Sequence, residues 1–319
     1  MRFLQVSEHA GRYVASLVET APPTPGKGEL LIRVAASGLN RADLSQIAGR
    51  YPPPPGESEI LGMEVAGTRE GSGERVCALL AGGGHAEYVA APAGQVFPSP
   101  PSERVNPTAA AGIPEAFVTA FVNLVVEAGL QAGQTVLVHA GASGVGLAAI
   151  QVAKYLGARV AATTRTRDKL SAIEQAGADL AVQAPGGDFQ SAIESRFGAN
   201  AVDVVLDPVG AATLAQDLAV LSPRGHVIFL ATMSGAQAAL DLSLLTKKRA
   251  RVVGSMLRSR SREEKAALVA RFRREILPGF DEGKLRVVVD SVFPPERAAE
   301  AFQRMRDNRN VGKILIDWS

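Results

Sequence analysis

The chain contains 319 residues, 46% of them hydrophobic and 21% charged, which is the balance of a globular protein long enough for two domains. Its 34 lysines and arginines nearly balance 32 aspartates and glutamates, so no large field attracts nucleic acid or a membrane surface. The single cysteine, Cys77, excludes an intramolecular disulfide and any multi-cysteine zinc or iron–sulfur site.

The first third of the chain is predicted to form an irregular, mostly antiparallel β domain. It begins without the apolar core of a signal peptide. Strand-forming residues occupy 29–36, 75–80 and 85–90. Turn-forming residues separate them, among them the prolines at 52–55 and the glycines at 82–84.

The most apolar stretch follows at 116–130. It contains Glu127 and is directly preceded by Pro114 and Glu115. We expect it to be too short to span a bilayer, and the protein to be soluble and cytoplasmic.

Beyond this stretch, apolar strands alternate with helices. The predicted strands are 136–139, 158–163, 180–182, 202–206, 226–231 and 250–256. The predicted helices are a small-residue segment ending at 156, then 168–176, 189–197 and 212–221. The chain ends with helix 262–276, strand 286–293, helix 295–307 and strand 313–317. The alternation predicts an α/β fold with a parallel, doubly wound sheet and helices on both of its faces.

The segment TVLVHAGASGVGLAAIQ (135–151) carries the clearest functional signal. An apolar strand runs into a turn where Gly141, Gly144 and Gly146 allow tight bending and close approach of the next helix. Gly141 and Gly146 keep the G-x-G-x-x-G register, whereas Ser143 replaces the middle glycine and could hydrogen-bond a phosphate. A strand–helix turn without a ligand is the simpler alternative. The further strand–helix units favour a dinucleotide pyrophosphate site at the helix N-terminus.

The residues after the second strand of this half favour NADP over NAD. An acidic residue at this place would bind the ribose 2′-hydroxyl of NAD. The sequence instead has Arg165, flanked by Thr164 and Thr166 and followed by Arg167 and Lys169. Cationic and hydroxyl groups suit a 2′-phosphate, whereas a merely solvated basic helix start would be electrostatically unfavourable. We therefore predict NADPH as the cofactor.

Several segments along the whole chain carry a family resemblance: ASGLNRADL (36–44), GRYPPPPG (49–56), LGMEVAG (61–67), GGGHAEYV (82–89), IPEAFVTAF (113–121), HAGASGVGLAAIQ (139–151), SMLRSR (255–260) and NVGKI (310–314). Through them the sequence resembles the zinc-independent quinone oxidoreductase branch of the medium-chain dehydrogenase/reductase superfamily. The resemblance implies a mostly β, GroES-like catalytic domain from residues 1–117 and 262–319, and a Rossmann NADP-binding domain at 118–261.

The zinc alcohol dehydrogenases of that superfamily place a cysteine and a histidine where this sequence has Asn40 and Met63. An amide and a thioether cannot replace a thiolate and an imidazole as zinc ligands, so we expect no metal. Without zinc to polarise an alcohol oxygen, the reasonable hydride acceptor is one that is already electrophilic, such as a quinone or an activated enone.

The resemblance also implies roles for individual residues. As catalytic residues, Tyr51 would hydrogen-bond an acceptor oxygen and Asn40 would position the acceptor or the nicotinamide. The alternative for Tyr51 is a surface ring stacked on the prolines that follow. The residues implied to bind the cofactor are Asn40, Thr119, Gly141, Ser143, Gly144, Val145, Thr164, Arg165, Thr166, Lys169, Phe229, Leu230, Met256, Leu257, Arg258 and Asn310.

The residues near the expected 2′-phosphate and the four histidines each allow one further interpretation. Ala184 and Pro185 stand where relatives often carry a tyrosine near the 2′-phosphate, so selectivity would depend on Arg165, Thr166 and Lys169. His9, His85, His139 and His226 share no ligand spacing, and we interpret them as structural.

Two other functions are compatible with the sequence besides quinone reduction. An NADPH-dependent reductase of α,β-unsaturated ketones or aldehydes is the nearest alternative. A non-enzymatic NADPH- or RNA-binding relative is another, because residues 247–251 are locally basic, although a solvated connection explains them more simply. We expect a small-molecule quinone or enone as partner, no membrane, and nucleic acid only as the minor alternative. The last strand, 250–256, would leave an exposed sheet edge, which predicts a homodimer.

Overall fold

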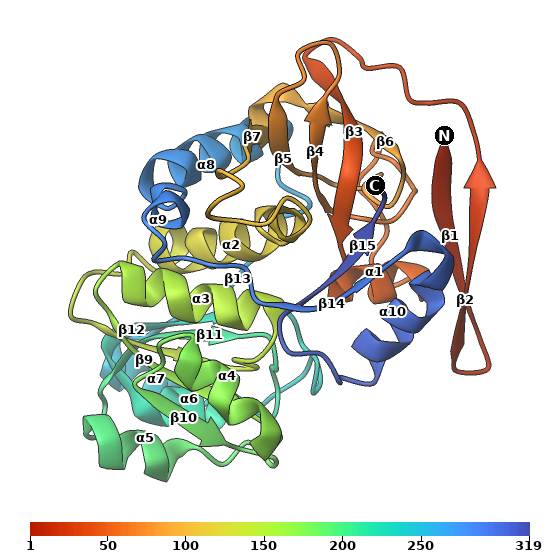
Figure 1. Cartoon of the computed structure of the whole chain (residues 1–319). Helices are drawn as coiled ribbons and strands as arrows, with labels where there is room; N and C mark the ends of the chain where they lie inside the picture. The colour runs from red at the N-terminus through yellow and green to blue at the C-terminus, as the bar shows by residue number, and fades with distance from the viewer. The chain divides into compact units, whose positions relative to one another are not determined.

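The computed structural model describes all 319 residues and divides into two compact units. Unit 1 consists of Met1–Val118 and Leu257–Ser319, and unit 2 of Thr119–Met256. Figure 1 shows the red N-terminal and blue C-terminal strands within the same unit. The domain boundaries proposed from sequence, after 117 and after 261, fall close to the borders of these units.

A seven-stranded sheet forms the centre of unit 1. Its order is β14 (Val289–Phe293), β15 (Lys313–Asp317), β3 (Glu29–Gly38), β4 (Glu64–Arg69), β5 (Arg75–Leu79) and β7 (Val96–Pro98), with β6 (Tyr88–Pro92) also paired to β3. Only β14 and β15 run parallel. The register places Ala36 of β3 between Asp317 of β15 and Ala66 of β4. The two ends of the chain are therefore joined through β3.

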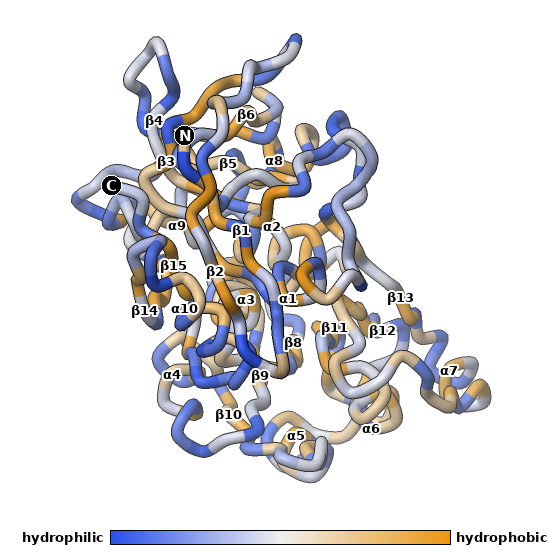
Figure 2. The backbone as a smooth tube through the Cα atoms, turned by 90° about the vertical axis from the view of Figure 1, so that its right-hand side faces the viewer, coloured by the Kyte–Doolittle hydropathy of each residue, from blue (hydrophilic) through white to orange (hydrophobic).

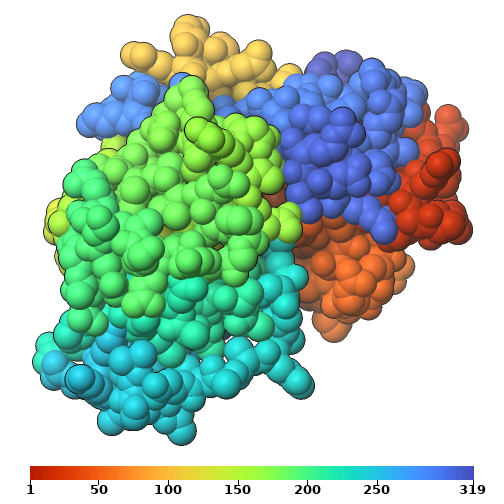
Figure 3. All heavy atoms as spheres, turned by 90° about the horizontal axis from the view of Figure 1, so that it is seen from below, coloured from red at the N-terminus to blue at the C-terminus, as the bar shows by residue number.

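A two-stranded hairpin, β1 (Arg2–His9) and β2 (Arg12–Glu19), completes the strands of unit 1. Figure 2 shows hydrophobic residues along both strands, and Leu4 and Tyr13 belong to the buried core. The ring of Phe302 contacts that of Tyr13 with centroids 5.8 Å apart. Phe302 lies in α10, whose blue atoms lie beside the red hairpin in Figure 3.

The helices of unit 1 are short, apart from one. They are α1 (Arg41–Ile47), α8 (Arg262–Glu275), α9 (Pro278–Asp281) and α10 (Ala298–Arg306), with single 3₁₀ turns at Ala93–Gln95 and Pro295–Arg297. Ser261 caps α8 by accepting a hydrogen bond from the Glu264 amide. Two acidic residues in its first turn and two arginines in its last complement the helix dipole.

A continuous helical run crosses the border of the two units. It comprises a 3₁₀ segment (Ala109–Gly112), α2 (Pro114–Phe121) and a π-helical segment (Val122–Glu127). The run Ala109–Glu127 has 19 residues and passes as a membrane-spanning helix by length and composition alone, because it extends N-terminally beyond the stretch 116–130 that was expected to be too short. Pro114 does not break it, because proline is tolerated in the first turn of a helix. Since 72% of the apolar window is buried inside the structure, the run has the burial of a core helix.

Unit 2 is a six-stranded parallel sheet in the order β10 (Leu180–Gln183), β9 (Arg159–Thr164), β8 (Thr135–Val138), β11 (Val202–Asp207), β12 (Leu221–Phe229) and β13 (Arg251–Gly254). Its helices are α3 (Gly144–Tyr155), α4 (Leu170–Gln175), α5 (Gln190–Phe197), α6 (Leu214–Val220) and α7 (Leu242–Lys248). Right-handed crossovers place α3 and α4 on one face and α5 and α6 on the other. The predicted doubly wound sheet is confirmed.

The order in which successive strands are added reverses between β8 and β11, which lie side by side and parallel in the middle of the sheet. In doubly wound sheets, ligands bind outside the carboxyl ends of the strands at such a switch point. All four residues of β8 are buried, which explains why this strand is continuously apolar.

Some predicted elements differ from the observed ones. The strand expected at 85–90 begins only at Tyr88, because His85 points into the core and its amide bonds the Leu61 carbonyl. Helix α7 was not predicted. It begins at an Asp241 cap and packs Leu244 and Leu245 against the core of unit 2.

Candidate functional site

The turn after β8 forms the start of α3. Ser143 caps the helix, and its hydroxyl accepts a hydrogen bond from the Gly146 amide at 3.0 Å. The amides of Gly144 and Val145 have no acceptor within the helix because the residues one turn before them are not helical. They are available to an anion at the positive end of the helix dipole.

Close packing fixes this turn. A Cβ atom on Gly146 would lie 2.4 Å from the Ala140 carbonyl oxygen, and one on Gly141 would lie 2.8 Å from Ala162 Cβ. Ala140 has a φ of 50°, in the left-handed region, which costs about 1–2 kcal/mol for a residue with a side chain. The sequence thus brings the start of α3 directly against β8, which is the shape a dinucleotide pyrophosphate requires.

The basic segment follows β9 at the same edge of the sheet. Thr164 is buried, and its hydroxyl accepts a hydrogen bond from the Thr166 amide at 3.5 Å. Arg165 and Thr166 are exposed, and the guanidinium of Arg165 has neither a hydrogen bond nor an ion pair. Lys169 is partly buried in the 3₁₀ turn that follows. An exposed, unpaired guanidinium next to two hydroxyls has the chemistry of a 2′-phosphate site.

The remaining predicted residues of unit 2 are dispersed. Thr119 is buried, and its carbonyl accepts a hydrogen bond from Asn123 Nδ2 at 2.7 Å. Phe229 ends β12, and the Leu230 amide bonds the Asp207 carbonyl at the end of β11. Met256 follows β13 and is 53% exposed.

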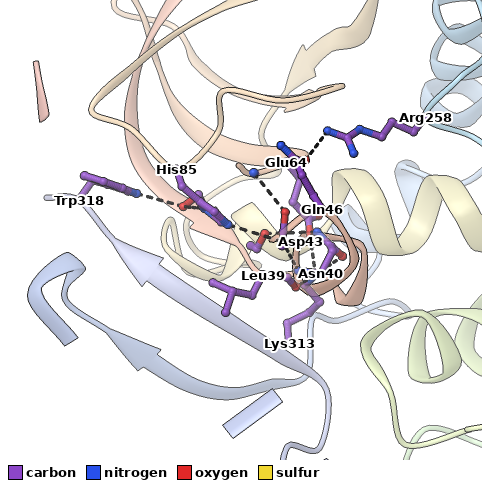
Figure 4. A network of polar contacts seen from close by, with 12 residues as sticks. Leu39, Asn40, Asp43, Gln46, Glu64, His85, Arg258, Lys313 and Trp318 are labelled. Atoms are coloured by element: carbon purple, nitrogen blue, oxygen red, sulfur yellow. Dashed lines mark hydrogen bonds and ion pairs between the residues drawn. The ribbon is translucent and has the colours of Figure 1, made fainter. Parts of the chain in front are cut away.

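A buried polar network surrounds Asn40 in unit 1, as Figure 4 shows. Asn40 precedes α1, and the Nδ2 atom of its side chain donates a hydrogen bond to the Glu64 carboxylate at 2.9 Å. The Lys313 ammonium donates to Asn40 Oδ1 at 2.9 Å and to the Leu39 carbonyl at 2.8 Å, and it forms an ion pair with Glu64. Glu64 is fully buried and Lys313 is 5% exposed. The ammonium thus balances a carboxylate that no water reaches.

These residues do not fit a zinc ion. Asn40 offers an amide, Met63 is buried as an apolar side chain, and the ammonium of Lys313 is a cation hydrogen-bonded to Asn40 and Glu64. Zinc sites are built from thiolates, imidazoles and carboxylates, not next to a fixed positive charge. No group of three or more His, Cys, Asp or Glu side chains in the structure could hold a metal ion.

Tyr51 is held by Arg258, also within unit 1. The guanidinium lies 5.1 Å from the centre of the Tyr51 ring and donates to the Tyr51 carbonyl at 3.0 Å. It also donates to the Ala81 carbonyl and to Gln46 Oε1, each at 2.7 Å. The guanidinium of Arg258 thus holds Tyr51 in place within unit 1. The sequence predicted cofactor binding for Arg258 and missed this structural role.

Burial, together with the negative charge of Glu115, raises the pKa of Tyr51 to about 12. The positive charge of Arg258 opposes this rise. The phenol therefore stays protonated at physiological pH and can donate a hydrogen bond. The other two predicted residues of unit 1 lie elsewhere in it: Leu257 is buried, and Asn310 Nδ2 donates to the Gly312 carbonyl at 2.9 Å.

Two further networks involve histidines that the sequence offered only as structural. In unit 1, His85 Nδ1 lies 2.8 Å from Ser37 Oγ, which also accepts from Trp318 Nε1. In unit 2, His139 lies between Thr163 and Asp217. No spacing in the sequence connects these partners; the only signal is a polar residue at a position that the helix or strand pattern buries.

Two protein families match this chain, one in its N-terminal part and one in its middle part. Residues 26–101 match the family described as the alcohol dehydrogenase GroES-like domain, and residues 144–273 match that described as zinc-binding dehydrogenase. The chain is 30% identical to a quinone oxidoreductase from Lama guanicoe, over 99% of this chain and 97% of the relative. It is 31% identical to the human synaptic vesicle membrane protein VAT-1 homolog, over 93% of this chain and 80% of the relative.

Among solved structures, the quinone oxidoreductase from Thermus thermophilus, determined alone and with NADPH, superposes with a TM-score of 0.82. Its sequence is 32% identical, and the match covers 99% of this chain and all of that one. The two family matches cover different parts of the chain, whereas these relatives match nearly all of it, so both parts belong to one known two-domain architecture.

Proposed function

This chain belongs to the medium-chain dehydrogenase/reductase superfamily, and from that premise we propose that it is an NADPH-dependent quinone oxidoreductase that works without zinc. It is an oxidoreductase of this superfamily, and its cofactor is NADP(H). Bound NADPH supplies a hydride. The choice of acceptor and the independence from zinc are the proposal.

The observation that carries the proposal is the Lys313 ammonium bound to Asn40 and Glu64. It leaves no Lewis acid at the place where an alcohol oxygen would be polarised. A quinone needs no such activation, because its carbonyl groups and conjugated ring already accept a hydride. Positioning of the two reactants is then the main task of the protein.

In the proposed reaction, unit 2 binds NADPH and unit 1 provides groups for the acceptor. The amides of Gly144 and Val145 would hold the pyrophosphate, and Arg165 would bind the 2′-phosphate. The phenol of Tyr51 would donate a hydrogen bond to a quinone oxygen, with its ring fixed by Arg258. A hydride supplied by the cofactor and a proton from water would together convert the quinone to the hydroquinone.

The RNA-binding alternative finds less support in the basic residues. The Lys248 ammonium is buried and donates to the carbonyls of Leu218, Ala219 and Leu221. It therefore stabilises the end of α6, where a positive charge is favourable, and cannot reach a phosphate.

Steady-state rates of NADPH oxidation with 1,2-naphthoquinone and with a simple enone, measured in parallel, test the choice of acceptor. We expect quinone turnover, and about tenfold lower kcat/KM in Tyr51→Phe with an unchanged Kd for NADPH. Pro55→Ala, on the exposed part of the same loop, is the matched control. Turnover of the enone alone would contradict the proposal and support the enone reductase instead.

A further inference from the structure

His139 lies at the point where three strands of unit 2 end. It follows β8 directly and is 1% exposed. Its Nδ1 lies 2.8 Å from the Thr163 hydroxyl of β9, and its Nε2 lies 2.7 Å from Asp217 Oδ1 of α6. The ring of Phe189, before α5, covers the imidazole at a centroid distance of 4.7 Å. Both ring nitrogens therefore have a partner, and no water is needed to satisfy them.

A second carboxylate completes the cluster. Asp207, at the end of β11, accepts hydrogen bonds from the Thr213 hydroxyl at 2.7 Å and the Gly210 amide at 3.1 Å. Its charge acts on both His139 and Asp217. The other oxygen of Asp217, Oδ2, is buried without a hydrogen-bond partner. The only cation within this group of side chains is a protonated His139.

The cluster is attached to the dinucleotide turn by the backbone. The Gly141 amide donates to the Thr163 carbonyl at 2.8 Å, on the residue whose hydroxyl meets His139. Between His139 and Gly141 stands Ala140, in the left-handed conformation. Strand β9 ends at the next residue, Thr164, and Arg165 follows directly after it. His139 therefore joins the strand that carries the pyrophosphate turn to the strand that carries the basic segment.

We propose that His139 is a positioning residue for the dinucleotide, and that its protonation and the binding of the dinucleotide favour each other. The inference rests on NADP(H) binding at the turn after β8. The imidazolium donates from both nitrogens, to Thr163 and to Asp217, and so holds β8, β9 and α6 in one arrangement. A neutral imidazole donates from only one nitrogen.

Electrostatics gives the direction of the coupling. Burial lowers the pKa of His139, but the charge and hydrogen bond of Asp217, with a smaller contribution from Asp207, raise it above its usual value in balance. The charged groups that face the imidazole are these two carboxylates, from α6 and β11. When His139 loses its proton, the cluster carries two negative charges beside an anion-binding turn. Thermodynamic reciprocity then requires that bound dinucleotide favours the protonated form.

The test is the Kd of NADPH, measured by fluorescence from about pH 7 to about pH 9, a range above the titration of the 2′-phosphate near pH 6. In the native protein we expect the Kd to rise by up to about tenfold per pH unit once the pH exceeds the pKa of His139. In His139→Gln the Kd should be higher at pH 7 and nearly independent of pH. Asp217→Asn keeps a hydrogen-bond acceptor but removes the charge, so the rise should begin at lower pH.

Two controls separate positioning from general damage. His226→Gln alters another histidine of unit 2, which lies in β12, and should keep the native pH profile. NADH, which lacks the 2′-phosphate, should show the same pH dependence as NADPH.

A readout on the native protein covers the case in which His139→Gln fails to fold. Nuclear magnetic resonance of labelled imidazoles should show the pKa of His139 rising when NADPH binds. An unchanged pKa, or a pH profile that His139→Gln leaves unaltered, would overturn the inference while leaving NADPH binding intact. Failure of NADPH to bind at any pH would overturn both this inference and the proposed function.

Discussion

At the scale of single residues, unit 1 contains a buried pair of opposite charges that also need neutral hydrogen-bond partners. Glu64 is fully buried, and its carboxylate accepts from Asn40, from the Glu115 amide and from Lys313. Such a carboxylate is costly to bury unless a cation and hydrogen bonds accompany it. The sequence shows an asparagine where relatives have a metal ligand, but only the fold shows that a lysine from the C-terminal strand binds to it.

Lys313→Met should therefore lower the free energy of unfolding by about 3–5 kcal/mol, because it leaves the Glu64 carboxylate unpaired in the core. Chemical denaturation measures the loss. Lys27→Met, at an exposed lysine of the same unit, is the control and should change stability by less than about 0.5 kcal/mol. The second change Glu64→Gln should recover part of the loss, and equal losses in the two lysine variants would contradict the pairing.

The His139 cluster makes a different prediction about pH and stability. Burial, with the nearby Asp207, raises the pKa of Asp217 from 3.8 to about 6, although His139 opposes the shift. A carboxyl whose pKa is higher in the folded protein binds more protons there than in the unfolded chain, so its contribution to stability falls as pH rises from about 4 to 6. The raised pKa of His139 extends this fall above pH 6.5.

Asp217→Asn should remove the part of this pH dependence that comes from Asp217, about 2–3 kcal/mol between pH 4 and pH 6. Carboxyls with lowered pKa values, such as Asp179 and Asp290, act in the opposite direction and stay unchanged in both proteins. Only the difference between the native and variant curves is therefore informative. Parallel curves of unfolding free energy against pH would count against the shifted carboxyl.

At the scale of elements, the start of α3 depends on its distance from β8. Gly146→Ala would place a Cβ atom 2.4 Å from the Ala140 carbonyl oxygen, so the helix must move away from the strand. We expect loss of measurable NADPH binding at concentrations that saturate the native protein, and a lower melting temperature. Gly186→Ala, in unit 2 at a site with nothing within 4 Å of the new Cβ, is the control. Normal NADPH binding by Gly146→Ala would contradict this role of close packing.

The elements that the sequence predicts are those with a clear local signal, such as a continuous apolar run or a glycine turn. The six parallel strands follow from buried apolar runs such as that of β8, and α3 follows from the glycine turn. Helices α1 and α7 were not predicted; each begins after a polar cap, Asn40 or Asp241, in a stretch that the strand–helix alternation did not mark as helical. The contacts of Lys313, Arg258 and Asp217 join segments far apart in the chain, so no local pattern could predict them.

At the scale of the whole molecule, the sheet of unit 2 ends at β13. This edge strand carries Val252, 39% exposed, and Leu242, Met233 and Met256 are further exposed hydrophobic residues of unit 2. Unpaired edges with apolar side chains favour association with another strand. We predict a homodimer that pairs through β13.

Val252→Lys should weaken this association, because a charge on the edge opposes strand pairing. Light scattering should give the mass of a dimer for the native chain and a larger monomer fraction for the variant. Val14→Lys, at an exposed valine of the β1–β2 hairpin in unit 1, is the matched control and should remain dimeric. A monomeric native protein would refute the prediction.

We propose that this oxidoreductase reduces quinones with NADPH and needs no zinc. The most direct measurement combines the zinc content of the protein, after dialysis against a chelator, with its rate of NADPH-dependent reduction of 1,2-naphthoquinone. We predict a full rate at a zinc content far below one ion per chain, with no increase when zinc is added. A rate that falls with the zinc content and returns when zinc is restored would contradict the claim.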